Sequence, residues 1–166
     1  MPIADTLIME LDLEAKTTRR VLERVPEDKL TWKPHIKSMS LGRLAQHVAT
    51  IPGSISGMTR LDSFDVERFT EPPALESTAA LVAAMDESVA QAKADLAATA
   101  DAAMMKDWSF NMGGKPIMTV PRIGVYRSIL LNHLYHHRGQ LTVYLRLLNV
   151  PVPSIYGPSA DENPFA

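Results

Sequence analysis

Residues 122–149 read RIGVYRSILLNHLYHHRGQLTVYLRLLN and show the clearest helical pattern in the chain. Its apolar residues recur in alternating steps of four and three, which is the repeat of a helix with one buried face. The positions on this stripe are Leu130, Leu134, His137, Leu141, Tyr144 and Leu148. The spacing predicts a long helix over about 122–149 whose apolar side packs against other helices.

Three further segments show the same helical repeat. The first apolar stripe spans residues 7–25 and stops before Pro26, and the second spans 40–58 and opens at Ser40, a suitable N-cap. A third stripe, rich in alanine, covers residues 81–96. Four such helices can shield their apolar faces only by packing together, so the sequence predicts an all-α fold, a four-helix bundle.

Two other segments are expected outside the helices. Before the last helix, residues 108–110 and 117–120 flank Asn-Met-Gly-Gly-Lys, a pattern typical of a small hairpin or an ordered loop. After Asn149, four prolines and a glycine predict an extended C-terminal tail. With 166 residues, 46% of them hydrophobic, the chain can bury one core, so residues 1–166 are expected to form a single domain.

Composition excludes several classes of protein and site. The chain has no cysteine, which excludes disulfides, thiolate metal ligands and a cysteine nucleophile. Its net charge of −2 comes from 17 basic and 19 acidic residues spread along the sequence, so no nucleic-acid or anionic-membrane partner is expected. The N-terminal 13 residues do not have the pattern of a signal peptide, and no apolar run approaches the ~20 residues of a membrane span. A soluble cytoplasmic protein is expected.

Three of the five histidines crowd into residues 132–140. His133 and His137 are four residues apart, so on a helix their rings leave the same face with β-carbons roughly 6 Å apart, close enough to hold one ion. His136 is three residues from His133 and competes for the role of second ligand, although it is rotated away from His137. A hydrogen-bonded core histidine is the alternative interpretation for each position.

A third imidazole is available from the second expected helix. His47 lies three residues after Leu44 and four before Ile51, and it reaches the pair if the second and fourth helices are neighbours. Gln46 and Gln140 are candidates to hydrogen-bond the second ring nitrogen of a ligand.

Three neutral imidazoles would leave a coordination position open, as in catalytic zinc sites, and would leave the ion its full double charge. Such an ion favours the anionic form of a water or thiol that binds it. Imidazole suits zinc, nickel, iron(II) and copper alike, so the ligands do not identify the metal. A zinc-protease helix is excluded because Leu134 stands where its glutamate would follow the first histidine.

Four stretches carry a family resemblance that spans nearly the whole chain: LTWKP at 30–34, MSLGRLAQH at 39–47, HLYHHRGQ at 133–140 and VPSIYGPSADE at 152–162. They are similar to the DinB-like bundle proteins, a damage-inducible family proposed to contain metalloenzymes. The resemblance implies an up-down-down-up order of helices, commonly a homodimer, and one metal held by one histidine of the second helix and two of the fourth. Those positions match His47, His133 and His137, which sets His136 aside.

The resemblance also implies zinc or nickel as the metal, with iron as a third option, and activities that use low-molecular-weight thiols such as bacillithiol or mycothiol. The leading hypothesis is therefore a metal-dependent enzyme acting on a small molecule, either a thiol-dependent transferase or a hydrolase, with no organic cofactor. The sequence identifies no catalytic residue beyond the ligands. The alternative is a stress protein that binds a metal or ligand without turnover, which a site closed by His136 or by a tail carboxylate would favour.

Overall fold

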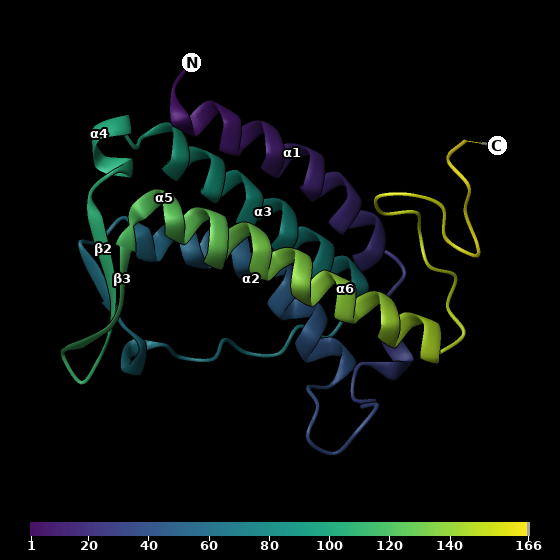
Figure 1. Ribbon diagram of the computed structural model, residues 1–166. Helices are drawn as coiled ribbons and strands as arrows, with labels where there is room; N and C mark the ends of the chain where they lie inside the picture. The colour runs from purple at the N-terminus through teal and green to yellow at the C-terminus, as the bar shows by residue number, and fades with distance from the viewer. Residues whose placement is uncertain (166) are drawn as a thin grey trace.

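Four long helices dominate the computed structural model, which describes residues 1–165 (Figure 1). They are α1 (Ile3–Leu22), α2 (Leu41–Thr59), α3 (Thr78–Ala97) and α6 (Asn132–Leu147). α1 and α6 run in one direction and α2 and α3 in the opposite direction (Figure 1). Each helix turns the apolar stripe expected from its sequence toward the core, where the residues of the stripe are buried or partly buried. α2 contacts both α3 and α6, which makes it the central element of the site described below.

The predicted all-α class is wrong, because a small mixed sheet caps one end of the helices. Within residues 1–165 the sheet has three strands, β1 (Ser63–Asp65), β2 (Asp107–Met112) and β3 (Lys115–Pro121), in the order β1-β2-β3. β1 pairs parallel with β2, and β2 pairs antiparallel with β3. The fold is therefore a helical layer with an attached three-stranded sheet rather than a bundle alone.

The antiparallel pair follows from a two-residue turn. Gly113 and Gly114 both have positive φ, 57° and 74°, which is the backbone of the hairpin turns that match strand twist. Residues with a β-carbon adopt this conformation at a cost, so two successive glycines fix the register in which Met112 opposes Lys115. The segment for which a hairpin or an ordered loop is expected is therefore a hairpin.

The helix expected over residues 122–149 forms in three consecutive parts. α5 (Arg122–Val125) leads into η3 (Tyr126–Leu131), a π-helical turn, and then into α6. A π turn inserts one extra residue into the helix and so rotates the residues that precede it relative to those that follow. Tyr126, Leu130 and Leu131 are all buried as a result, and α6 begins one residue before His133.

The shorter elements connect these parts. η1 (Glu27–Lys29) lies between α1 and α2, η2 (Val66–Arg68) follows β1, and α4 (Asp101–Met104) joins α3 to the sheet. Residues 69–77 form an extended connection that runs from the sheet end along α2 to the start of α3 (Figure 1).

The C-terminal tail folds back over one end of α1 and α6 (Figure 1). Glu162 pairs with Arg20 and with Arg24, the latter at 2.8 Å, and Asp161 pairs with Arg146. The backbone nitrogen of Val152 also donates to Asp161 at 2.8 Å. Both tail carboxylates are therefore engaged by arginines and by the tail's own backbone.

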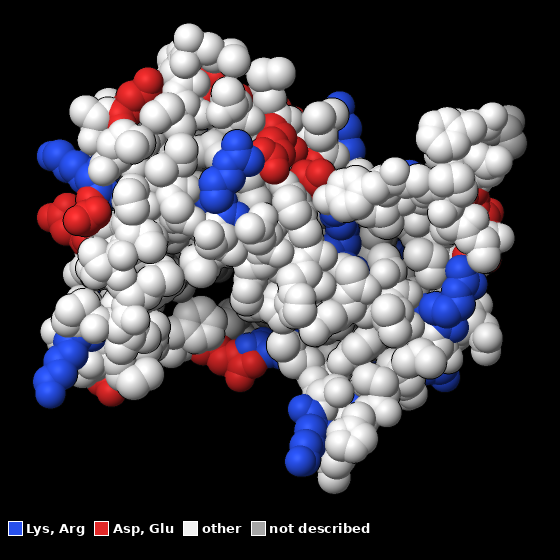
Figure 2. Space-filling view, in the orientation of Figure 1, with Lys and Arg blue, Asp and Glu red and all other residues white. Residues whose placement is uncertain are grey.

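On the face shown in Figure 2, basic and acidic side chains are interspersed. None of the helices within residues 1–165 combines the length and the apolar character needed to cross a membrane.

Candidate metal centre

His47 is presented by α2 at the edge of that helix's buried face. The helix begins at Ser40, whose hydroxyl accepts a hydrogen bond from the backbone nitrogen of Arg43 at 3.2 Å. Leu44 and Ile51, one turn to either side of His47, are 1% and 2% exposed. His47 itself is half-buried and lies where α2 faces α6.

His133 and His137 lie one turn apart on α6, as their spacing predicts. Their ring centroids are 4.4 Å apart, His133 is half-buried, and His137 is 8% exposed. Burial of Leu134 and Leu141 holds this face of α6 against the core. The helix therefore directs both imidazoles toward α2.

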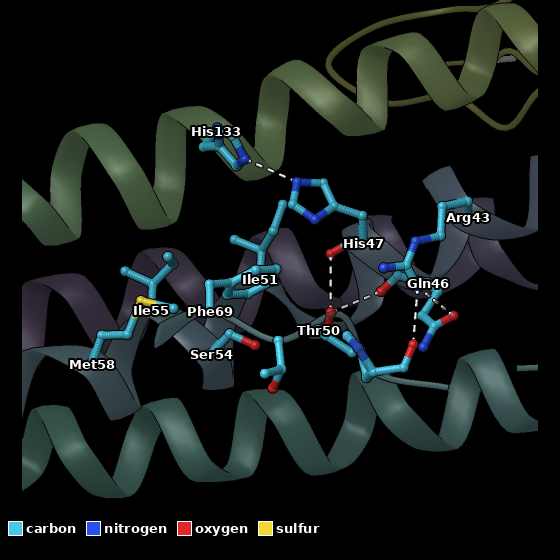
Figure 3. A pocket seen from close by; sticks show the side chains of 12 residues that line it. Arg43, Gln46, His47, Thr50, Ile51, Ser54, Ile55, Met58, Phe69 and His133 are labelled. Carbon is cyan, nitrogen blue, oxygen red and sulfur yellow. Dashed lines mark hydrogen bonds between the residues drawn. The ribbon is translucent and has the colours of Figure 1, made fainter. Parts of the chain in front are cut away.

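The three imidazoles converge on one point. The Nε2 atoms of His47 and His133 are 3.0 Å apart, and their rings point toward one another from α2 and α6 (Figure 3). One ring nitrogen from each of the three histidines lies within 4.8 Å of the other two. Tetrahedral zinc with Zn–N bonds of ~2.0–2.1 Å places its ligand nitrogens about 3.3 Å apart. The donors are thus close to the spacing that a single ion requires.

The electrostatics of the group favour neutral rings. Burial lowers the pKa of His47 to about 4, and the neighbouring imidazoles and the Arg43 guanidinium add to this effect. Burial also lowers the pKa of His133 and of His137. All three rings are therefore neutral at pH 7, which is the form that binds a metal ion.

Gln140 fixes the tautomer of His137. The Oε1 atom of Gln140 lies 2.7 Å from Nδ1 of His137, and because an amide oxygen only accepts, Nδ1 carries the proton. The lone pair of His137 is then on Nε2. Metal-ligating histidines commonly have such a partner on the other ring nitrogen. Gln46, the other glutamine singled out in the sequence, instead donates from Nε2 to the carbonyl of Pro73 at 2.6 Å.

The structure brings together the three histidines predicted as ligands and leaves the other candidates outside. His136 is exposed, and its ring lies beside that of His137 without joining the group. The tail carboxylates Asp161 and Glu162 are paired with arginines, as described above. Within residues 1–165 the group that could hold a metal ion comprises only His47, His133 and His137. That these residues bind a metal stays a prediction.

A cavity of about 230 Å³ adjoins His47 and His133. One wall is α2, and the facing wall is the start of the 69–77 connection, including Phe69 and Pro72. Sequence reasoning missed this wall because the connection has no periodic pattern. Its place is fixed by Gln46, which holds the Pro73 carbonyl and accepts from the backbone nitrogen of Leu75 at 3.2 Å.

The lowered histidine pKa values predict that the metal-free protein loses stability in mild acid. In the unfolded chain a histidine binds a proton near pH 6.5, whereas folded His47 does so only near pH 4. Between these values the unfolded state binds more protons, so the free energy of unfolding falls as the pH falls. Urea denaturation of the chelator-treated protein at several pH values from 7.5 to 4.5 measures this slope.

The His47→Gln variant is expected to show a shallower slope over the same range. His35→Gln serves as the matched control because the His35 ring is exposed and lies outside the group. A slope that His47→Gln leaves unchanged would contradict the assignment of a neutral, half-buried imidazole.

The chain matches the DinB family over residues 3–164. The uncharacterized protein YrdA of Bacillus subtilis is 26% identical over 158 residues, which cover 95% of this chain and 90% of YrdA. Crystal structures of two DinB-like proteins also resemble it. The one from Bacillus cereus has a TM-score of 0.69 at 22% identity, covering 92% of this chain and 97% of that one. YjoA from Bacillus subtilis has a TM-score of 0.70 at 17% identity, covering 91% and 96%. At these identities the two structures show a shared fold.

Proposed function

This chain belongs to the DinB family, and from that premise we propose that it is an enzyme that depends on one divalent metal ion. The observation that carries the proposal is the convergence of three imidazole nitrogens within 4.8 Å, in a group that contains no carboxylate. Three neutral donors match the first sphere of catalytic zinc sites, which leave one position for a water or a substrate.

The spacing of the imidazole nitrogens itself fits a cation. The Nε2 atoms of His47 and His133 lie 3.0 Å apart, so without a metal ion one neutral ring donates its Nε2–H to the lone pair of the other, and a cation would take the place of that hydrogen. Burial lowers the pKa of His47 and so keeps its ring free of the additional proton that would repel a cation. His47, His133 and His137 would hold the ion, with zinc or nickel as the leading candidates and iron(II) as a third.

A bound divalent ion would supply a Lewis acid that stabilises the anion of a thiol or of a water. The residues of this chain orient the site. Gln140 holds the ring of His137, and residues of the 69–77 connection form one wall of the adjoining cavity.

The lining of the cavity favours a thiol as the nucleophile. Among the described residues that line it there is no aspartate, glutamate or tyrosine, so this chain supplies no carboxylate or phenol base there. A thiol with a pKa near 8.5 needs less help to ionise than water does. We therefore place thiol-dependent group transfer first and hydrolysis second, with a small molecule as the substrate.

The same lack of a base favours a second candidate, a protein that binds metal and ligand without turnover. An assay separates the two. Zinc- and nickel-loaded protein is incubated with low-molecular-weight thiols and with alkylating, epoxide and ester electrophiles. We expect turnover with at least one pair, reduced at least 100-fold in His137→Ala and retained in His136→Ala. Absence of turnover with every pair, or turnover that His137→Ala leaves intact, would contradict the enzyme proposal.

The homodimer expected from the resemblance stays a prediction, and light scattering on the eluting protein in size-exclusion chromatography tests it.

A further inference from the structure

The cavity beside the histidines has two chemically different ends. Its α2 wall is a single stripe that begins at Arg43, passes His47, Thr50 and Ser54, and ends at Met58. With a rise of ~1.5 Å per residue, Arg43 lies about 6 Å along the helix axis on one side of His47, and Ile55 about 12 Å on the other. The imidazoles therefore stand between the two ends (Figure 3).

The far end is apolar. Ile51, Ile55 and Met58 of α2 face Phe69 of the connection across the cavity. Figure 3 shows Ile55 and Met58 on the side of His133 away from Arg43, and Phe69 near Ile51. Phe69 is 53% exposed although it lines the cavity, so a guest molecule would bury aromatic surface that is now in contact with water.

The near end carries the only formal charge among the described residues that line the cavity, the Arg43 guanidinium. Its Nη1 atom donates to the carbonyl of Pro72 at 3.2 Å, which holds the side chain against the connection. Its ionic partner, Glu71, is 67% exposed and does not line the cavity. An ion pair with so exposed a partner contributes little to the free energy of unfolding. An anionic ligand can therefore replace Glu71 beside Arg43 with little loss of stability.

The volume limits the size of the ligand. Drug-sized ligands occupy pockets of roughly 300–1,000 Å³, whereas this cavity holds about 230 Å³. The cavity therefore suits a molecule of about ten non-hydrogen atoms.

We propose that this cavity binds a small amphiphilic carboxylic acid, with the carboxylate at Arg43 and an unbranched or aromatic apolar group against Ile51 and Phe69. A ligand in this orientation has its central atoms beside His47 and His133. Which of these atoms would react depends on the proposed function, and this part of the inference rests on it. Binding of the acid itself does not depend on a metal ion.

Calorimetry with octanoate, hexanoate and octan-1-ol tests the proposal, on metal-free and on zinc-loaded protein. We expect octanoate to bind the metal-free protein about tenfold more tightly than octan-1-ol, because the alcohol lacks the charge that Arg43 recognises. Each methylene that becomes buried raises the affinity about fourfold. Hexanoate, which is two methylenes shorter, is therefore expected to bind about 15-fold more weakly than octanoate.

Variants locate the ligand. Arg43→Gln is expected to weaken the binding of octanoate about tenfold and to leave the binding of octan-1-ol unchanged, whereas Phe69→Ala is expected to weaken the binding of both. Arg68→Gln is the matched control, because it removes a nearby exposed cation that does not line the cavity. Methyl resonances of Ile51 should shift on titration with octanoate, which ties the binding to the part of the cavity beside Phe69.

The test of acid binding and the test of the metal-dependent reaction can give different results. Octanoate that binds only in the presence of zinc, or with an affinity that Arg43→Gln does not change, overturns this inference even if the loaded enzyme turns over thiols. Conversely, if octanoate binds in the predicted pattern but no turnover is found, the acid site is supported and only the enzyme proposal is contradicted.

Discussion

Replacing His137 with alanine is expected to abolish stoichiometric binding of zinc or nickel. The variant keeps only His47 and His133, whose facing Nε2 atoms then form a two-ligand site. Loss of a supporting hydrogen-bond partner alone costs roughly 10–100-fold in metal affinity, and loss of a direct ligand is expected to cost more than this. Elemental analysis of untagged protein after dialysis against each metal measures the effect.

His136→Ala is the matched control for this variant. It removes an imidazole from the adjacent position, but that ring is exposed and lies outside the convergent group. We expect full metal occupancy in His136→Ala and the same loss in His47→Ala as in His137→Ala. Equal occupancy in all three variants would show that the metal binds elsewhere.

The largest effect on stability is expected from Arg138, which is 2% exposed. Its Nη1 atom lies 2.6 Å from a carboxylate oxygen of Glu14 and donates to the hydroxyl of Thr18 at 3.1 Å. Its Nη2 atom donates to the hydroxyl of Tyr156 at 2.6 Å, and the guanidinium stacks near the rings of Tyr135 and Tyr156. One side chain therefore joins α6, α1 and the tail.

Arg138→Met keeps the aliphatic stem but leaves the Glu14 carboxylate, 13% exposed, without its cation. Breaking a buried pair in this way typically costs about 3–5 kcal/mol of unfolding free energy. Urea denaturation measures the loss, and Arg138→Met combined with Glu14→Gln should recover part of it.

Arg127→Met provides the comparison on the same face. Arg127 pairs with Glu10 of α1 as Arg138 pairs with Glu14, but its side chain is 47% exposed. An exposed pair is worth at most about 1 kcal/mol. Similar losses for Arg127→Met and Arg138→Met would contradict the view that burial decides the contribution.

The sequence predicts the helices because their stabilisation is periodic. Residues such as Leu134 and Leu141 on α6 are apolar in helical steps, and the structure buries them. The hairpin was foreseeable for a similar local reason, since Gly113 and Gly114 specify its turn. β1 was not, because three residues carry no period and its partner, β2, lies more than 40 residues further along the chain. The prediction of an all-α fold was wrong because it did not include this nonlocal pairing of β1 with β2.

The candidate site also combines features that follow from local spacing with features that depend on tertiary contacts. The spacing of His133 and His137 is local, so it predicts a shared face, and helix geometry then accounts for the exposure of His136. The approach of His47 depends on α2 lying against α6, which no pattern within either helix specifies. The role of Gln46 in holding the 69–77 connection depends on tertiary contacts alone and had no signal in the sequence.

Anomalous diffraction from crystals of the zinc-loaded protein, collected at the zinc edge, would locate the metal ion. We expect one peak bonded to nitrogens of His47, His133 and His137, at about 2.0–2.1 Å, with at least one remaining position filled by solvent or ligand. A peak away from these three rings, or a fourth ligand supplied by the protein, would contradict an open three-histidine site.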